Sequence, residues 1–148
     1  MLDRGLKTKP IIEEEDHGIT RKSTAFFEEY RDCLGDILAV SCTKTADGDW
    51  KTNVYGEDTR MILYGFSFGY CGEGVRGLID LVKACGIKLT DTDIESVMLN
   101  IKGRNKVAFF HKRNLENGDH GHAFIYRECP DGLAGVDVYE QGILAMIA

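Results

Sequence analysis

Residues 37–55 read ILAVSCTKTADGDWKTNVY, and this stretch decides the fold. Residues 37–44 are rich in the residue types that favour strands. Asp47-Gly48 suits a tight hairpin turn, because both central residues of such a turn need positive φ. Residues 50–55 alternate between the two faces of an expected return strand. The stretch therefore predicts two antiparallel strands joined by a short turn.

A third strand is expected next, from Arg60 to Phe68, after a turn at residues 56–58. Sequential strands with short connections usually pair with their neighbours, so the three predict an antiparallel meander.

Apolar residues at helical spacing predict two helices that flank this meander in the sequence. The first begins near Ser23 or Thr24, either of which can cap a helix N-terminus, and it ends at Gly35. The second runs from about residue 75 to residue 85 and is stopped by Gly86.

Residues 95–102 alternate in the manner of a strand and are expected to form a second hairpin with residues 106–112. Thr92 and Glu95 also suit a capping box for a short helix, so the two interpretations stay open. The remaining expected elements are a strand at 122–129 and an apolar helix at 136–148.

The chain has 148 residues, the size of one domain. We expect residues 20–148 to form a single α+β domain, with a mainly antiparallel sheet of five or six strands and two or three packed helices. Residues 1–19 are polar and carry both signs of charge. They are expected to form a flexible N-terminal arm unless the apolar pair Ile11-Ile12 docks.

The composition of the chain argues against several classes of function. The net charge is −6, and no cluster of Lys and Arg is present to displace counterions from a phosphate backbone, so nucleic acid is not an expected partner. No apolar run is long enough for a membrane span, and the first residues lack the apolar core of a signal peptide. An odd number of cysteines without a C-x-x-C pair predicts reduced thiols in a cytoplasmic protein. They are Cys33, Cys42, Cys71, Cys85 and Cys129.

Residues 61–70, MILYGFSFGY, carry the most chemistry. In an extended chain one face is almost entirely aromatic. The aromatic side chains are either part of the core or the floor of a pocket on which a flat ring can stack. The residues of this face are Ile62, Tyr64, Phe66, Phe68 and Tyr70.

Glycines surround the junction between this segment and the following helix. Free N–H groups and the helix dipole favour an anion at such a place. The segment lacks the Gly-Lys-Ser/Thr of a Walker sequence and the spacing of a dinucleotide fingerprint, and a plain turn with a helix start is the alternative. In the binding hypothesis Tyr64, Phe66 and Tyr70 stack on the ligand, and Gly72, Gly74 and Arg76 hold the anion.

Cys71 precedes the expected helix, where the helix dipole favours a thiolate. His120 and His122 follow later, and His122 opens an expected strand. A Cys at a helix start with a later His on a strand resembles the chain order of papain-like cell-wall peptidases. In that family the Cys directly begins its helix, whereas here Val75 occupies the comparable place. The resemblance implies a cysteine hydrolase with Cys71 as nucleophile and His122 or His120 as base.

Three late histidines, His111, His120 and His122, offer enough imidazoles for a zinc site, but no carboxylate partner is evident, and we expect no metal or cofactor. The leading expectation is a cytoplasmic, non-enzymatic binding protein that takes an anionic small ligand or a protein partner through residues 64–77. The cysteine hydrolase and an inhibitor or immunity-like protein are the alternatives. The apolar residues 143–147 leave a homodimer open.

Overall fold

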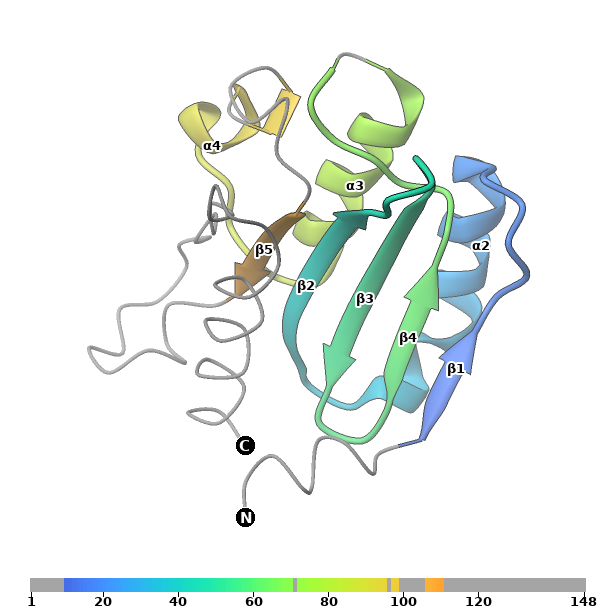
Figure 1. The fold of residues 1–148 in the computed structure, drawn as a ribbon. Coiled ribbons are helices and arrows are strands. Elements are labelled where there is room, and N and C mark those ends of the chain that lie inside the picture. Colours follow the sequence, from blue (N-terminus) through green and yellow to red (C-terminus); the bar gives the residue numbers. More distant parts are fainter. Residues whose placement is uncertain (1–9, 71, 96, 99–105, 111–148) are drawn as a thin grey trace.

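The computed structural model describes residues 10–70, 72–95, 97–98 and 106–110 (Figure 1). A five-stranded mixed sheet, mostly antiparallel, has the order β1-β4-β3-β2-β5. This confirms the predicted α+β class. The strands are β1 (Ile11–Glu13), β2 (Ile37–Lys44), β3 (Trp50–Gly56), β4 (Arg60–Leu63) and β5 (Lys106–Phe110). The helices are α2 (Thr20–Tyr30), a 3-10 helix η1 (Arg31–Leu34), α3 (Glu73–Ala84) and α4 (Asp91–Glu95).

The central hairpin of β2 and β3 forms as predicted, with Val40 opposite Val54. Its turn is longer than the expected two-residue turn. The Thr45 N–H donates to the Asp49 carbonyl at 2.7 Å, and the Gly48 N–H donates to the Thr45 carbonyl at 2.9 Å. Gly48 has φ +88°, whereas no residue other than glycine has positive φ in the described part of the chain. The turn thus needs one left-handed residue, which Gly48 supplies.

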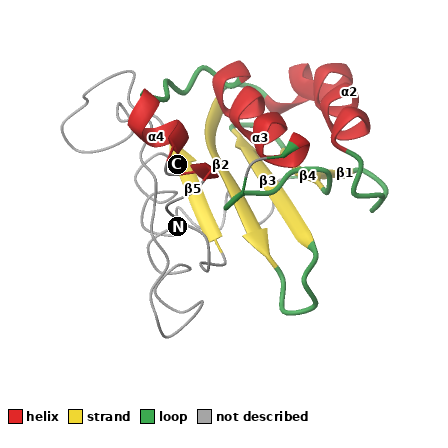
Figure 2. Cartoon of the chain, turned by 90° about the horizontal axis from the view of Figure 1, so that it is seen from above, coloured by secondary structure: helices red, strands yellow, loops and turns green. Residues whose placement is uncertain are grey.

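The helices α2 and α3 lie on the same side of the sheet, as Figure 2 shows from above. Alternation along the strands points every second side chain at these helices, and these side chains form the core. The sheet contributes Val40, Cys42, Val54, Met61, Leu63, Val107 and Phe109. The helices contribute Phe27, Val75, Leu78, Ile79, Leu81 and Val82.

Helix α2 begins at Thr20, earlier than predicted. Neither Ser23 nor Thr24 caps it, and the residue before the helix, Ile19, makes no capping bond with its side chain. The Thr20 hydroxyl donates to the Gly65 carbonyl at 2.6 Å, which anchors the first turn to a distant segment. Tertiary contacts rather than a local cap therefore set this helix start. Gly35, with φ +73°, follows the last helical residue, as expected.

Helix α3 matches its prediction closely, including its end. Gly86 has φ +83°, and its N–H donates to the Lys83 carbonyl at 2.9 Å. The Ile87 N–H donates to the Val82 carbonyl at 3.3 Å. These bonds satisfy carbonyls that a helix C-terminus would otherwise leave open.

Strand β4 was expected to continue to Phe68, but it ends at Leu63. The Tyr64 N–H donates to a carboxylate oxygen of Glu14 at 2.7 Å, so it no longer joins the strand ladder. The chain then leaves the sheet and runs beside the starts of α2 and α3 (Figure 1). The predicted single aromatic face of residues 62–70 is therefore wrong.

The strand expected at residues 95–102 is also wrong where the structure describes it. Glu95 ends α4, and residues 97 and 98 lie in a helical turn. The capping box involves Thr90 and Asp93, two residues earlier than the pair predicted. Strand β5 pairs with β2, and residues 99–105, which complete the expected hairpin, lie outside the described residues. The elements expected at 122–129 and 136–148 lie outside the described residues.

Ile11 and Ile12 dock against β4. The sequence predicts a flexible arm at residues 1–19 only if this pair does not dock. They form β1, which runs parallel to β4 with Ile12 opposite Met61. The Arg60 N–H donates to the Pro10 carbonyl at 3.0 Å. Residues 10–19 thus belong to the folded domain, and residues 1–9 lie outside the described part.

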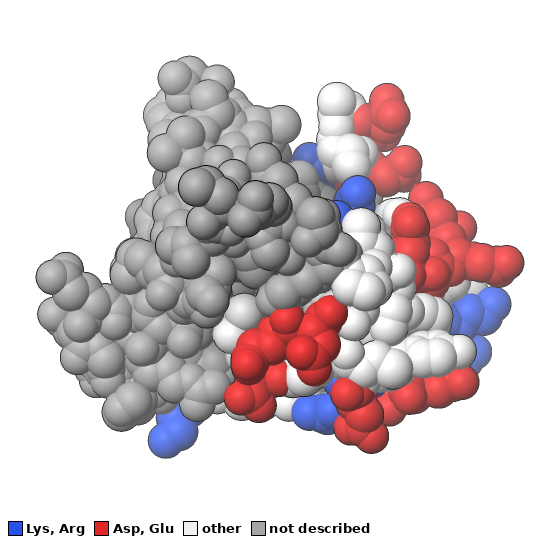
Figure 3. All heavy atoms as spheres, turned by 90° about the horizontal axis from the view of Figure 1, so that it is seen from below, with Lys and Arg blue, Asp and Glu red and all other residues white. Residues whose placement is uncertain are grey.

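Acidic side chains dominate the face seen in Figure 3, where they gather in several groups with basic side chains scattered between them. This agrees with the net charge of −6. Within the described ranges, no helix is long and apolar enough to cross a membrane.

Gly77 is the point of close approach between α3, the start of α2 and the ring of Phe66. A Cβ built on Gly77 would lie 2.9 Å from the Phe66 ring and still closer to the Thr20 methyl. We expect Gly77→Ala to lower the free energy of unfolding by about 1–3 kcal/mol, because overpacking outweighs the better helix propensity of alanine. Urea denaturation measures the change. Asp80→Ala, on the exposed face of α3, is the control; a Gly77→Ala protein more stable than the wild type would contradict the packing.

Burial protects the thiol of Cys42. Loss of solvation raises its pKa from the ordinary 9.0 to about 12, whereas Cys33 is exposed. Iodoacetamide at pH 8 should therefore modify Cys33 in the folded protein and Cys42 only after unfolding, as peptide mass spectrometry can measure. The thiol of Cys42 loses its proton at a lower pH in the unfolded chain than in the folded protein. The free energy of unfolding therefore falls as pH rises from about 9 towards 12. Equal labelling of both thiols in the folded protein would contradict the burial.

Candidate functional site

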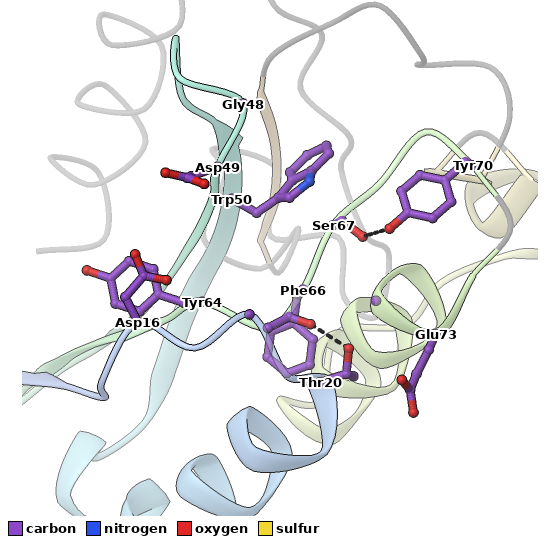
Figure 4. Close-up of a pocket in the computed structure, with 13 residues that line it drawn as sticks. Asp16, Thr20, Gly48, Asp49, Trp50, Tyr64, Phe66, Ser67, Tyr70 and Glu73 are labelled. Carbon is purple, nitrogen blue, oxygen red and sulfur yellow. Dashed lines mark hydrogen bonds between the residues drawn. The ribbon is translucent and has the colours of Figure 1, made fainter.

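A cavity of about 350 Å³ opens where the β2–β3 turn, the segment before α2 and residues 64–74 meet (Figure 4). This volume falls in the range of small-molecule sites. The lining residues come from all three segments. They are Asp16, Gly18, Thr20, Gly48, Asp49, Trp50, Tyr64, Gly65, Phe66, Ser67, Tyr70, Glu73 and Gly74.

Glu14 holds two of these segments together. Its side chain is buried, with the residue only 6% exposed, and it accepts hydrogen bonds from the Ser23 hydroxyl and from the Tyr64 N–H. His17 Nε2 lies 2.8 Å from its other oxygen, and His17 Nδ1 accepts from the Ile19 N–H at 2.8 Å. The second bond requires an unprotonated Nδ1, so the proton of a neutral ring is on Nε2 and points to Glu14. This carboxylate was not among the residues singled out in the sequence.

Tyr64 forms one side of the cavity. Its hydroxyl donates to the Glu13 carboxylate. That bond, burial and the negative charges of Glu13, Asp16 and Glu14 raise the pKa of Tyr64 to about 12. The phenol therefore stays protonated across the physiological range in strongly negative surroundings.

Trp50 lies on the hairpin side of the cavity and is the chain's one tryptophan. Its ring meets the edge of Phe68, with centroids 4.9 Å apart and planes at 72°. The ammonium of Lys44 lies 5.6 Å from the Trp50 ring centroid. The sequence placed Trp50 on a strand face but offered no sign that it would face residues 64–74.

Tyr70 closes the opposite side and is 48% exposed. Its hydroxyl lies 2.8 Å from the Ser67 hydroxyl, next to the start of α3. A Cβ on Gly72 would lie 2.6 Å from the Tyr70 ring, and a Cβ on Gly74 would lie 2.5 Å from Ser67 Oγ. Close packing of the loop thus explains both glycines without a bound anion.

The structure brings together part of the site predicted from the sequence. Tyr64, Phe66, Tyr70 and Gly74 line the cavity, whereas Gly72 and Arg76 are not among its lining residues. Phe66 is 1% exposed and belongs to the core, so its ring has little surface left for stacking. The cavity adds residues that the sequence did not indicate, chiefly Trp50 and the carboxylates of Asp16, Asp49 and Glu73.

The residues of the hydrolase hypothesis, Cys71, His120 and His122, lie outside the described residues, as does His111. Within the described ranges, no group of three or more His, Cys, Asp or Glu side chains is arranged to hold a metal ion.

Comparisons with protein-family models, with curated proteins and with solved structures find no match. Function must therefore be inferred from the chemistry of the cavity.

Replacement of Glu14 tests its role in building the cavity. Glu14→Ala leaves the Tyr64 N–H and the Ser23 hydroxyl without their acceptor, and we expect a loss of about 3 kcal/mol in the free energy of unfolding. Glu15→Ala, one residue further along and exposed, should change it by less than about 0.5 kcal/mol. Urea denaturation of both variants at neutral pH provides the measurement. Similar effects of the two substitutions would rule out the proposed role of Glu14.

Proposed function

We propose that this chain is a cytoplasmic, non-enzymatic binding protein that holds a small molecule in the cavity beside residues 64–74. The observation that carries the proposal is the cavity of about 350 Å³, to which Trp50, Tyr64 and Tyr70 bring aromatic side chains from different segments. Clefts of this size with aromatic walls and a few polar groups are the usual form of small-molecule sites.

The accessibility of these side chains supports binding. Tyr70 is half exposed, and Trp50 and Tyr64 are partly buried, so each retains surface for a flat ligand. The paired hydroxyls of Ser67 and Tyr70 can bond a polar group of the ligand.

The polar groups around the cavity support binding. The described lining offers hydroxyl and carboxylate groups, which can hydrogen-bond a polar part of a ligand. Cys33 and Cys42 are free thiols, which supports the cytoplasmic location. The protein partner, the inhibitor or immunity-like role and the homodimer remain predictions, which no contact of the described residues favours.

Trp50 provides the test, because as the chain's one tryptophan it reports directly on the cavity. A thermal-shift screen of small aromatic metabolites would identify ligands, and titration monitored by Trp50 fluorescence would measure their affinity. Tyr70→Ala should weaken binding roughly tenfold, the value of one lost aromatic contact. Tyr55→Ala is the control, since Tyr55 is also on a half-exposed face of the protein but does not line the cavity.

Two results would refute the proposal. One is a screen in which no ligand raises the melting temperature. The other is binding that leaves both Trp50 fluorescence and the Tyr70→Ala affinity unchanged, because the ligand would then occupy another place.

A further inference from the structure

The charge of the cavity wall has one sign. Asp16 precedes α2, Asp49 ends the β2–β3 turn, and Glu73 lies in the first turn of α3. In Figure 4 Asp16 lies beside Tyr64, the side chains of Asp49 and Trp50 extend in opposite directions from the hairpin, and Glu73 lies on the far side near α3. The described lining includes neither Lys nor Arg. Carboxylates from separate segments thus surround aromatic side chains.

The Tyr64 phenol lies in part of the same field. Its pKa is raised first by the bond to Glu13 and then by burial, and the charges of Glu13, Asp16 and Glu14 add to the shift. The negative charges that disfavour a phenolate there would also disfavour a bound anion. They would favour a cation at the same position.

The features that favour an anion are weaker. The dipole at the start of α3 amounts to roughly half a positive charge, and Glu73 already occupies that first turn. Arg76 is exposed and does not line the cavity. Lys44 does not line it either, although its ammonium lies over the Trp50 ring.

Lys44 lies directly opposite Trp50 in the β2–β3 hairpin, which places a cation beside the ring. An ammonium group 5.6 Å from the ring centroid is within the range of a cation–π interaction. Aromatic side chains combined with carboxylates are an arrangement that recognises organic ammonium groups.

From this arrangement, and resting on the function proposed above, we infer that the ligand is a small organic cation: an amine or quaternary ammonium group attached to a flat, apolar body. The ammonium group lies on the side of the cavity where Asp16 and Asp49 stand, and the flat body lies against Trp50. This differs from the anionic ligand expected from the sequence.

Three probes of similar size separate charge from shape: benzyltrimethylammonium, benzyl alcohol and benzoate. Titrations monitored by Trp50 fluorescence and by calorimetry should rank the cation at least tenfold tighter than the alcohol, with benzoate weakest. The affinity for the cation should fall as sodium chloride is raised. If the alcohol or benzoate binds as tightly as the cation, the charge preference is wrong while the binding function stands. If none of the three binds at millimolar concentration, the inference is wrong, and the thermal-shift screen decides the binding function.

Single substitutions test which carboxylates produce the preference for a cation. Asp16→Asn and Asp49→Asn should each weaken binding of benzyltrimethylammonium about three- to tenfold and leave benzyl alcohol unchanged. Asp47→Asn is the control, because Asp47 lies in the same turn but does not line the cavity. Lys44→Gln should strengthen binding of the cation by removing a competing ammonium. Equal losses in Asp47→Asn and Asp49→Asn would assign the preference to net charge alone and overturn the inference; circular dichroism checks that every variant is folded.

Discussion

One buried carboxylate constrains much of this structure. A charged group removed from water must be hydrogen-bonded, or its burial is strongly unfavourable. Glu14 meets this condition with donors from α2 and from the residue after β4, with His17 beside its other oxygen. The bond from the Tyr64 N–H ends β4, and the bond from Ser23 ties α2 to the same carboxylate. A separate bond, from the Thr20 hydroxyl to the Gly65 carbonyl, holds the first turn of α2 against the segment after β4. The cavity exists where these segments are held together.

The parts of the fold that were predictable are those that local chemistry decides. Alternation identifies β2 and β3, and left-handed glycines end η1 and α3 at Gly35 and Gly86. The errors have a common cause in distant partners. Tyr64 leaves the sheet because its N–H binds a carboxylate fifty residues earlier. Strand β5 pairs with β2, which lies far earlier in the chain, and a local pattern cannot reveal such a partner.

The candidate site also has a part that the sequence indicates and a part that only the fold brings together. Tyr64, Tyr70 and Gly74 stand out in the sequence and lie at the cavity, because one continuous segment carries them. Trp50, Asp16 and Asp49 come from other segments, and their convergence depends on the tertiary fold. The expected preference for an anion came from glycines and a helix start. Those glycines accommodate the Tyr70 ring and the Ser67 hydroxyl, and the sign of the cavity's charge is set by side chains that the glycine pattern does not include.

The parallel pairing of β1 with β4 has a consequence for the order of folding. The β2–β3–β4 meander closes through short turns, whereas β1 docks only after the long intervening chain has been brought round. Closing a long loop carries a larger entropic barrier than closing a hairpin, so β1 joins after the meander. The wall that contains Asp16 follows β1 and is completed at the same late stage. A chain with its hairpins already formed would thus lack a complete cavity until its N-terminal strand docks.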